Sequence, residues 1–397
     1  MKKKRHIMII AGEPSGDLHG ANLIKELKDR GKFSIENGSF TDVNQSLIIT
    51  GIGGDLMAEA GMNLFFHIKD LSVMGLTEVI AQFWQIKRAF ELFQENIIAK
   101  KPDLLILIDY PGFNLKAAKF AKQRDVPVLY YIAPKVWAWN RARLKKIKQY
   151  VDHVAFIFPF EELIFKKAKI PATYVGNPLL DCYVMDSFLS NNTTDKITIG
   201  ILPGSRESEI ASLFEIMLQS ANIISKSIRY DSKFIQFSNI DFLISAASSI
   251  NINKFNNILE PYNKDNQFEV IRGEPSELFR RCDILIAASG TVTLEAAIFG
   301  LPMVIVYKTS SFTYFIAKHF VKIPYIGLPN IVAKYQIVPE LLQHNATPEK
   351  IANQILLMLN PATLAYIKKR LLMVPRYLGG SGAAKRVSKI AMQMLKS

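Results

Sequence analysis

The chain has 397 residues, of which 49% are hydrophobic and 21% are charged. This length exceeds what one hydrophobic core usually fills, so the sequence predicts two domains. It contains no run of about eighteen uncharged apolar residues, which argues against a membrane-spanning helix. The formal net charge of +14 favours anionic partners such as phosphorylated substrates or lipid headgroups. Nucleic acid is the weakest candidate, because neither an RNA-binding signature nor a zinc-finger spacing is present. Two isolated cysteines, Cys182 and Cys282, exclude a disulfide framework.

The beginning of the chain is basic, like that of an export signal, but the apolar run that follows ends at Ala11. So short a run indicates a first strand, so we expect a cytoplasmic protein. Apolar strand-like runs then alternate with segments of helical periodicity, which predicts a parallel sheet with helices on both faces. In the first half these runs are 6–11, 47–51, 104–108, 126–132, 151–156 and 173–176.

The loops that follow two of these strands form the first candidate site, because ligands of open parallel sheets collect beyond the carboxyl ends of the strands. Glu13 lies in the glycine-containing loop 12–17, where Ser15 or Asp17 is a candidate cap for the next helix. Asp109 ends an apolar strand, and desolvation there raises the pKa of a carboxyl group toward that of a useful general base. A role for Asp109 as an N-cap or as the partner of a cation is an equal alternative.

Two further segments of the first half combine aromatic and cationic side chains. Over residues 76–97 apolar side chains recur at helical spacing beside Trp84 and Lys87, a pattern typical of core packing and also of a helix lying on a lipid surface. Of these, core packing is favoured. The loop 133–139 holds two of the chain's three tryptophans, which either form a pocket wall or fill space beneath the loop.

After Pro178 the alternation is lost in a polar stretch and then resumes, which predicts a second α/β domain. Its strand-like runs are 197–202, 242–246, 268–271, 284–288 and 303–307. Helical patterns fill the end of the chain. We therefore expect an N-terminal domain over 1–177, a second domain over 178–355, and a helical segment over 356–397 that packs on the N-terminal domain or on a partner subunit.

Two loops of the second domain place small residues directly before a helix, where free N–H groups and the helix dipole attract phosphate. They contain Gly204, Ser205 and Arg206 in one case and Ser289, Gly290 and Thr291 in the other. Arg206 adds a cation for a departing diphosphate. Neither loop is a Walker motif, and such turns also begin purely structural helices. Glu295, one turn into its helix, either binds sugar hydroxyls or favours the helix start.

Nine blocks of the chain resemble, in the same order, those of the lipid A disaccharide synthase family, and the match covers residues 6 to 345. The blocks are 11–17, 51–54, 71–75, 108–114, 136–139, 202–206, 288–295, 328–330 and 338–343. The Val-Trp-Ala-Trp and Leu-Pro-Gly-Ser-Arg blocks are distinctive. The resemblance implies an α/β fold of GT-B type, with two Rossmann-like domains facing across a cleft and C-terminal helices.

The family resemblance also implies a reaction. Its members are inverting glycosyltransferases of lipid A biosynthesis that need no metal or cofactor and lie on the inner face of the inner membrane. They join UDP-2,3-diacylglucosamine to 2,3-diacylglucosamine 1-phosphate by a β-1,6 link and release UDP. Whether the chain forms a homodimer is left open.

Roles for particular residues follow from the same resemblance. Asp109 matches the family's essential aspartate and is the candidate general base for the acceptor's 6-hydroxyl, and Glu13 matches an acidic position and is the rival base. Arg206 and the two helix N-termini would stabilise the charge that builds on departing UDP. The blocks that resemble nucleotide-side or cleft motifs also contain Glu295, Asn330 and Glu340.

At two positions the chain departs from the family pattern. Asn177 stands where many members have histidine, and Gly112 where many have aspartate; we expect Asn177 to act as a hinge or positioning residue. Two other functions remain alternatives. A related UDP-GlcNAc epimerase would turn over that soluble sugar without an acceptor, and a nonenzymatic sugar-nucleotide binder would bind UDP and form no product.

Overall fold

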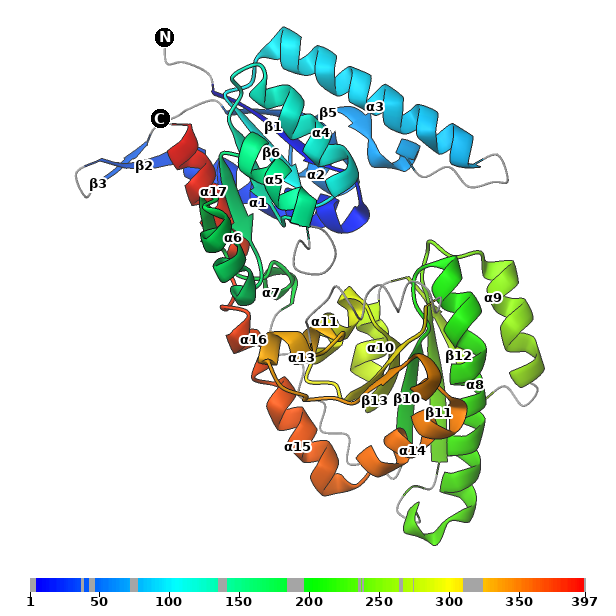
Figure 1. Cartoon of the computed structure of the whole chain (residues 1–397). Coiled ribbons are helices and arrows are strands. Elements are labelled where there is room, and N and C mark those ends of the chain that lie inside the picture. The colour runs from blue at the N-terminus through cyan, green and yellow to red at the C-terminus, as the bar shows by residue number, and fades with distance from the viewer. Residues whose placement is uncertain are drawn as a thin grey trace. The chain divides into compact units, whose positions relative to one another are not determined.

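The computed structural model describes residues 5–36, 39–42, 47–71, 78–134, 141–183, 196–234, 237, 239–263, 267–273, 275–309 and 324–395. The chain divides into two compact units (Figure 1). The first contains Met1–Cys182 together with Leu378–Ser397, and the second contains Tyr183–Tyr377. Residues 135–139 of the tryptophan-containing loop and residues 72–75 of the block 71–75 lie outside the described residues.

The first unit is built on a parallel sheet in the order β5-β4-β1-β6-β7-β8-β9. Its strands are β1 (Arg5–Ala11), β4 (Leu47–Gly53), β5 (Asn63–His67), β6 (Leu104–Ile108), β7 (Val128–Tyr131), β8 (His153–Phe156) and β9 (Ala172–Tyr174). Every residue of β6 is buried, as expected for an apolar strand covered on both faces. A separate antiparallel hairpin, β2 (Phe33–Glu36) and β3 (Ser39–Asp42), was not expected from the sequence.

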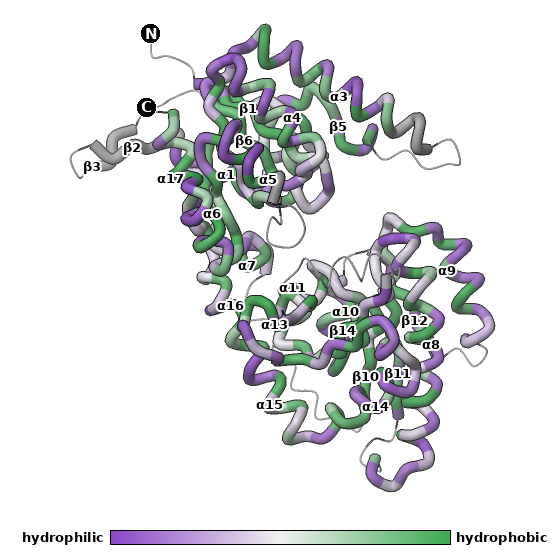
Figure 2. The backbone as a smooth tube through the Cα atoms, in the orientation of Figure 1, coloured by the Kyte–Doolittle hydropathy of each residue, from purple (hydrophilic) through white to green (hydrophobic). Residues whose placement is uncertain are grey.

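Helices cover both faces of this sheet, and the side chains of β1 alternate between the two layers that result. Met8 and Ile10 pack with one layer, whereas Ile7 and Ile9 pack with the other. The first layer is α3 (Glu78–Lys100), α4 (Pro111–Lys122), α5 (Arg141–Tyr150) and α6 (Glu162–Ala168); the second is α1 (Pro14–Lys32), α2 (Asp55–Glu59) and α17 (Ala383–Met394). Figure 2 shows hydrophobic residues along the strands and mixed hydropathy along helices such as α3.

The second unit has a parallel sheet in the order β12-β11-β10-β13-β14-β15. Its strands are β10 (Lys196–Leu202), β11 (Asn239–Ala246), β12 (Phe268–Arg272), β13 (Ile284–Ala288), β14 (Met303–Tyr307) and β15 (Glu340–Leu342). Its helices include α8 (Glu207–Tyr230), α9 (Ile252–Leu259), α10 (Pro275–Arg281), α11 (Thr291–Ile298), α13 (Leu328–Ala333), α14 (Pro348–Met358), α15 (Pro361–Leu371) and α16 (Val374–Tyr377). Two parallel-sheet α/β units confirm the fold class expected from the alternation.

The last helix returns to the first unit, where polar contacts fix both its start and its side. The carboxylate of Asp181, in α7 (Leu179–Cys182), accepts hydrogen bonds from the backbone N–H groups of Gly382 and, at 3.0 Å, Ala384. Arg386 Nε donates to the Val175 carbonyl at 2.6 Å. Within the described part of the chain, no helix combines the length and apolarity needed to cross a membrane.

Candidate functional site

Asp109 lies directly after β6, at the carboxyl edge of the first sheet. Asp109 and Tyr110 both have left-handed backbone angles, with φ of 45° and 43°, which are uncommon for residues with side chains. The Asp109 N–H donates to the Tyr131 carbonyl at 3.1 Å. The Asp109 carbonyl accepts from the Tyr130 hydroxyl at 2.8 Å and from Asn114 Nδ2 at 2.8 Å. Protein groups therefore hold this turn on both sides of Asp109.

Glu13 lies on the loop after β1, the strand next to β6, and its side chain is exposed. Gly12 must be small, because a Cβ there would lie 2.2 Å from the Tyr110 ring. Burial, and to a smaller degree the charge of Glu13, raises the pKa of Tyr110. The loops that carry the two candidate bases, Asp109 and Glu13, are thus neighbours, and the ring of Tyr110, from the Asp109 loop, lies against Gly12 of the Glu13 loop.

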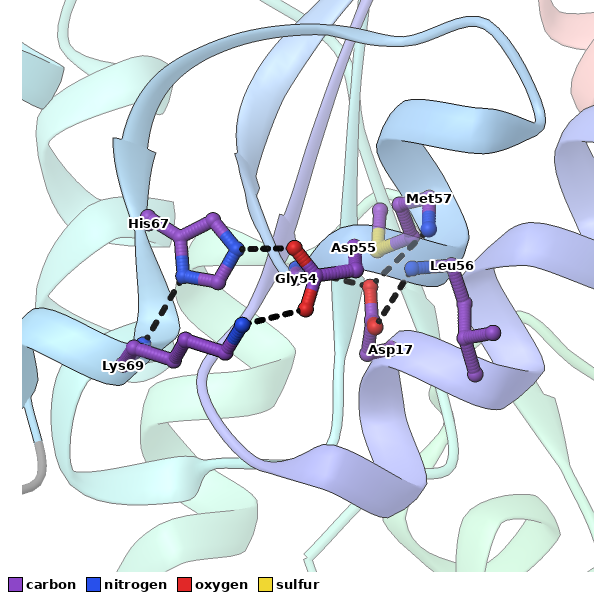
Figure 3. Close-up of polar contacts among 7 residues, drawn as sticks. All are labelled: Asp17, Gly54, Asp55, Leu56, Met57, His67 and Lys69. Carbon is purple, nitrogen blue, oxygen red and sulfur yellow. Dashed lines mark hydrogen bonds and ion pairs between the residues drawn. The ribbon is translucent and has the colours of Figure 1, made fainter.

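Asp17 has a different role from the one expected for it. It lies in the first turn of α1, and its carboxylate caps α2 rather than α1. It accepts from the N–H groups of Gly54 at 2.7 Å, Leu56 at 3.1 Å and Met57 at 3.1 Å (Figure 3). Ser15 and Asp17, the two candidate caps for α1, both lie inside that helix, so neither is its N-cap residue; the Asp17 carboxylate instead ties α1 to the loop after β4.

A second polar group beside this cap was not found from the sequence (Figure 3). Asp55 bonds to His67 Nε2 at 3.2 Å and to Lys69 Nζ at 2.6 Å, and the hydrogen bonds from Lys69 and His67 lower the pKa of Asp55. His67 Nδ1 accepts from the Lys69 N–H at 3.0 Å, which leaves the ring proton on Nε2, facing Asp55. Both ring nitrogens are in use, so His67 joins β5 to α2 and has no lone pair left to act as a base.

In the second unit, the loop between β10 and α8 contains three of the predicted phosphate-binding residues. Gly204 has a φ of 118°, which favours glycine. The Glu209 carboxylate accepts from the N–H groups of Ser205 at 3.0 Å and Arg206 at 3.3 Å, and from Arg206 Nη1 at 3.3 Å. The Arg206 side chain is otherwise 79% exposed. The two backbone donors therefore already hold an anionic group, the carboxylate of Glu209.

The loop between β13 and α11 contains the other three. Strand β13 pairs with β10, which leads into the Gly204 loop, so the two loops begin side by side. Gly290 is the N-cap residue of α11, which has no side-chain cap within the described chain, and a Cβ on Gly290 would meet nothing within 4 Å. Gly290 and Thr291 are exposed, and the Ser289 N–H donates to the Val306 carbonyl at 3.0 Å. The start of α11 is thus open where the start of α8 is capped.

Glu295 lies further along α11 and is partly buried. Its Oε2 accepts from the Tyr183 hydroxyl at 3.1 Å, and the Tyr183 ring packs edge-on against Phe299 with 5.0 Å between ring centroids. The carboxylate therefore has a protein partner in this structure.

Asn330 and Glu340 shape the segment around α13. Asn330 is fully buried; its Oδ1 accepts from the N–H groups of Ile337 at 2.7 Å and Val338 at 3.1 Å. Its Nδ2 donates to the Val338 carbonyl at 2.8 Å and to Glu340 Oε1 at 2.7 Å. Glu340 also accepts from the Gly327 N–H at 3.0 Å. The Asn330 amide is fully committed to holding this loop.

The two departures from the family pattern have different surroundings. Asn177 is 1% exposed; its Oδ1 accepts from the Leu179 N–H at 3.1 Å, and its own N–H donates to the Leu378 carbonyl at 3.2 Å. It therefore lies where the returning C-terminal segment meets the first unit. Gly112 is in the first turn of α4, and a Cβ there would meet nothing within 4 Å, so the fold does not require glycine at this position.

Solved structures similar over the whole chain share its fold at low sequence identity. A putative UDP-N-acetylglucosamine 2-epimerase from Listeria monocytogenes has a TM-score of 0.65 at 13% identity and covers 100% of this chain and 98% of its own. The S. aureus MnaA-UDP co-structure has a TM-score of 0.64 at 12% identity (99% and 98% covered). Acinetobacter baumannii MurG has a TM-score of 0.58 at 13% identity (98% and 100% covered). These likenesses support the GT-B fold.

The sequence comparisons identify the family. A family model described as lipid-A-disaccharide synthetase matches residues 7–390. A lipid-A-disaccharide synthase of Geobacter sulfurreducens is 38% identical over 396 residues, covering 98% of this chain and 97% of that protein. One of Coxiella burnetii is 36% identical over 364 residues, covering 90% and 89%. The chain therefore belongs to the lipid-A-disaccharide synthase family and is a glycosyltransferase of lipid A biosynthesis with a GT-B fold.

Proposed function

We propose that the protein transfers the sugar of UDP-2,3-diacylglucosamine to the 6-hydroxyl of 2,3-diacylglucosamine 1-phosphate, with inversion, to give a β-1,6-linked disaccharide and UDP. Family membership supports the reaction class. The structural observation that carries the proposal is the Asp109 turn, which holds a carboxylate at the carboxyl edge of a parallel sheet, where such folds bind ligands.

In the proposed reaction, the acceptor oxygen forms a bond to the anomeric carbon as the bond from that carbon to the UDP oxygen breaks. Asp109 takes the proton of the attacking hydroxyl, and the electron pair of the breaking bond goes to the diphosphate. Removal of a general base of this kind typically lowers the rate by about a hundredfold or more. Glu13, on the adjacent loop, remains the rival for this role.

Arg206 and the two helix starts of the second unit would stabilise the charge on the leaving diphosphate. The Ser289 N–H already donates to the Val306 carbonyl, but the start of α11, at Gly290 and Thr291, has no side-chain cap within the described chain and would accept a phosphate group. The Gly204 loop would join it once the diphosphate replaces the carboxylate of Glu209. Arg206 and Glu209 form a surface ion pair, and such pairs are weak enough to exchange partners.

We further propose that the beginning of α3 contacts lipid at the inner face of the inner membrane. The apolar stripe of this helix divides along its length: Phe93 and Ile97 are buried in the core, whereas Phe83 is 63% exposed and Trp84 58% exposed. Lys87 Nζ lies 5.0 Å from the centroid of the Trp84 ring. Exposed aromatic side chains next to a cation suit the boundary between lipid headgroups and acyl chains.

A transfer assay with radiolabelled donor and both acylated sugars tests the proposed reaction. We expect a labelled disaccharide and UDP only when both substrates are present. The likeness to UDP-GlcNAc 2-epimerase structures makes an epimerase the second candidate. Turnover of UDP-GlcNAc in the absence of an acceptor, with no disaccharide from the acylated pair, would establish that alternative and overturn the proposed reaction.

A further inference from the structure

Two adjacent tyrosines of β7 are equally buried but differ in what their hydroxyl groups contact. Tyr130 and Tyr131 are both 0% exposed, and they pack on opposite faces of the sheet. The Tyr130 hydroxyl donates to the Asp109 carbonyl at 2.8 Å. The Tyr131 hydroxyl has no hydrogen-bond partner among the residues that the structure describes. The hydroxyl of Tyr130 thus reaches the candidate base, whereas Tyr131 contacts Asp109 through its backbone carbonyl alone, so the Tyr131 hydroxyl provides a matched reference.

Asn114 holds the same carbonyl from the other side. This side chain is 0% exposed, and its Nδ2 donates to the carbonyl oxygens of Ile108 at 3.1 Å and Asp109 at 2.8 Å. Since Nδ2 faces two acceptors, the orientation of the amide is determined by its surroundings. The Asn114 N–H also donates to the Tyr110 carbonyl at 3.0 Å, closing the turn over both left-handed residues.

These contacts fix the direction of the Asp109 side chain through its backbone. The N–H of Asp109 is bonded to Tyr131, and its carbonyl is bonded to Tyr130 and Asn114, so the peptide groups on both sides of its Cα are held. The Cα–Cβ bond follows from those two planes. Left-handed backbone costs conformational energy for a residue with a side chain, so the turn depends on these bonds to persist.

The Tyr130 hydroxyl remains protonated near neutral pH and so remains a hydrogen-bond donor. Burial, followed by the negative charge of Asp109, raises the pKa of Tyr130 well above its ordinary value, so the phenol keeps its proton. A general base has to lie within hydrogen-bond reach of the proton that it removes, and small displacements of a catalytic group cost much of the rate.

We propose that Tyr130 and Asn114 are positioning residues that aim the Asp109 carboxylate at the acceptor hydroxyl, without touching either substrate themselves. This inference rests on the proposed function, in which Asp109 is the general base. It explains why a tyrosine hydroxyl and an amide are buried at a strand end and both donate to the Asp109 carbonyl.

The test compares Tyr130→Phe with Tyr131→Phe in the full-length protein, measuring kcat and the KM for each acylated substrate. Both variants remove one hydroxyl from a fully buried ring of the same strand. We expect Tyr130→Phe to lower kcat about tenfold with both KM values unchanged, since one hydrogen bond that orients the base is lost. Tyr131→Phe should keep the wild-type kcat. Asn114→Ala should lower kcat by at least as much as Tyr130→Phe, again without raising either KM.

A double variant separates this inference from the function on which it rests. If Tyr130 acts through Asp109, then Tyr130→Phe should cause no further loss in an Asp109→Asn background. A wild-type kcat in Tyr130→Phe, a rise in KM alone, or an equal tenfold loss in both backgrounds would overturn the positioning role while leaving Asp109 as the base. Wild-type turnover of Asp109→Asn itself would instead refute the base assignment.

Discussion

Replacing Asp17 with alanine removes a carboxylate that is 5% exposed and holds three backbone N–H groups at the start of α2 (Figure 3). A hydrogen bond to a charged group contributes about 1.5–3 kcal/mol, and loss of a helix cap costs about 0.5–2 kcal/mol. Because the three bonds share one side chain and water enters when it is removed, their contributions do not add. We expect the free energy of unfolding of the first unit to fall by about 3 kcal/mol.

Thermal unfolding measures this loss, because each 1 kcal/mol lowers the Tm of a domain of this size by about 2–4 °C, giving a decrease of about 6–12 °C. The matched control is Asp55→Asn, which changes a carboxylate in the first turn of the same helix. Asp55 pairs with Lys69 on the surface, where the two side chains are 60% and 73% exposed, so its loss should shift Tm far less. Equal shifts in the two variants would refute the assignment of Asp17 as a buried cap.

Other predictions concern the remaining charged and aromatic groups. Glu209→Gln removes the charge that occupies the Ser205 and Arg206 amides, so UDP should bind more tightly in calorimetry; an unchanged or weaker Kd would mean that the diphosphate does not use this loop. Burial lowers the pKa of His19 from 6.5 to about 4. As the pH falls from 6.5 to about 4, the unfolded chain therefore binds a proton at His19 that the folded chain does not, and the free energy of unfolding decreases. The decline of Tm should therefore be shallower in His19→Gln, and a decline parallel to wild type would contradict this. High salt should release the protein partly from anionic vesicles, and Trp84→Ala should increase the released fraction; binding insensitive to both changes would exclude the α3 contact.

Much of the fold follows from the sequence because its central strands are short apolar runs bounded by polar or glycine-rich loops. Strands β6 and β13 are of this kind, and all their residues are buried. The edge strand β5, Asn63–His67, was missed because it is brief and only one of its residues is buried. A sequence pattern reveals a strand through the apolar residues that burial requires, and an edge strand buries few residues.

The return of the C-terminal helix to the first unit depends on contacts between residues about two hundred positions apart in the sequence. Asp181 caps α17, and Arg386 bonds to the Val175 carbonyl. Helical patterns occur both before and after Gly379 and Gly380, and a helical pattern does not say which domain a helix packs on. Only the tertiary partners of α17 make that division.

The candidate site was predictable to a similar extent. Asp109 is identified by its position after a buried strand, but its hydrogen bond with the Tyr130 hydroxyl arises from the pairing of β6 with β7, which no local pattern contains. Glu209 follows the N-cap residue Arg206 by three positions and accepts from its N–H, as the glutamate of a capping box does. Arginine is not one of the residues that mark a capping box in a sequence, so the protein partner of the Ser205 and Arg206 amides was not predictable from the usual pattern.

The most direct test of the account is the rate of disaccharide formation by wild type, Asp109→Asn and a control, Asp125→Asn, with both acylated sugars at saturation. Asp125 also has a left-handed backbone, with a φ of 58°, but it is exposed and follows the far end of α4. We expect Asp109→Asn to be slower by at least about a hundredfold, with UDP binding intact, and Asp125→Asn to keep the wild-type rate. Disaccharide formation by Asp109→Asn at the wild-type rate would contradict the account.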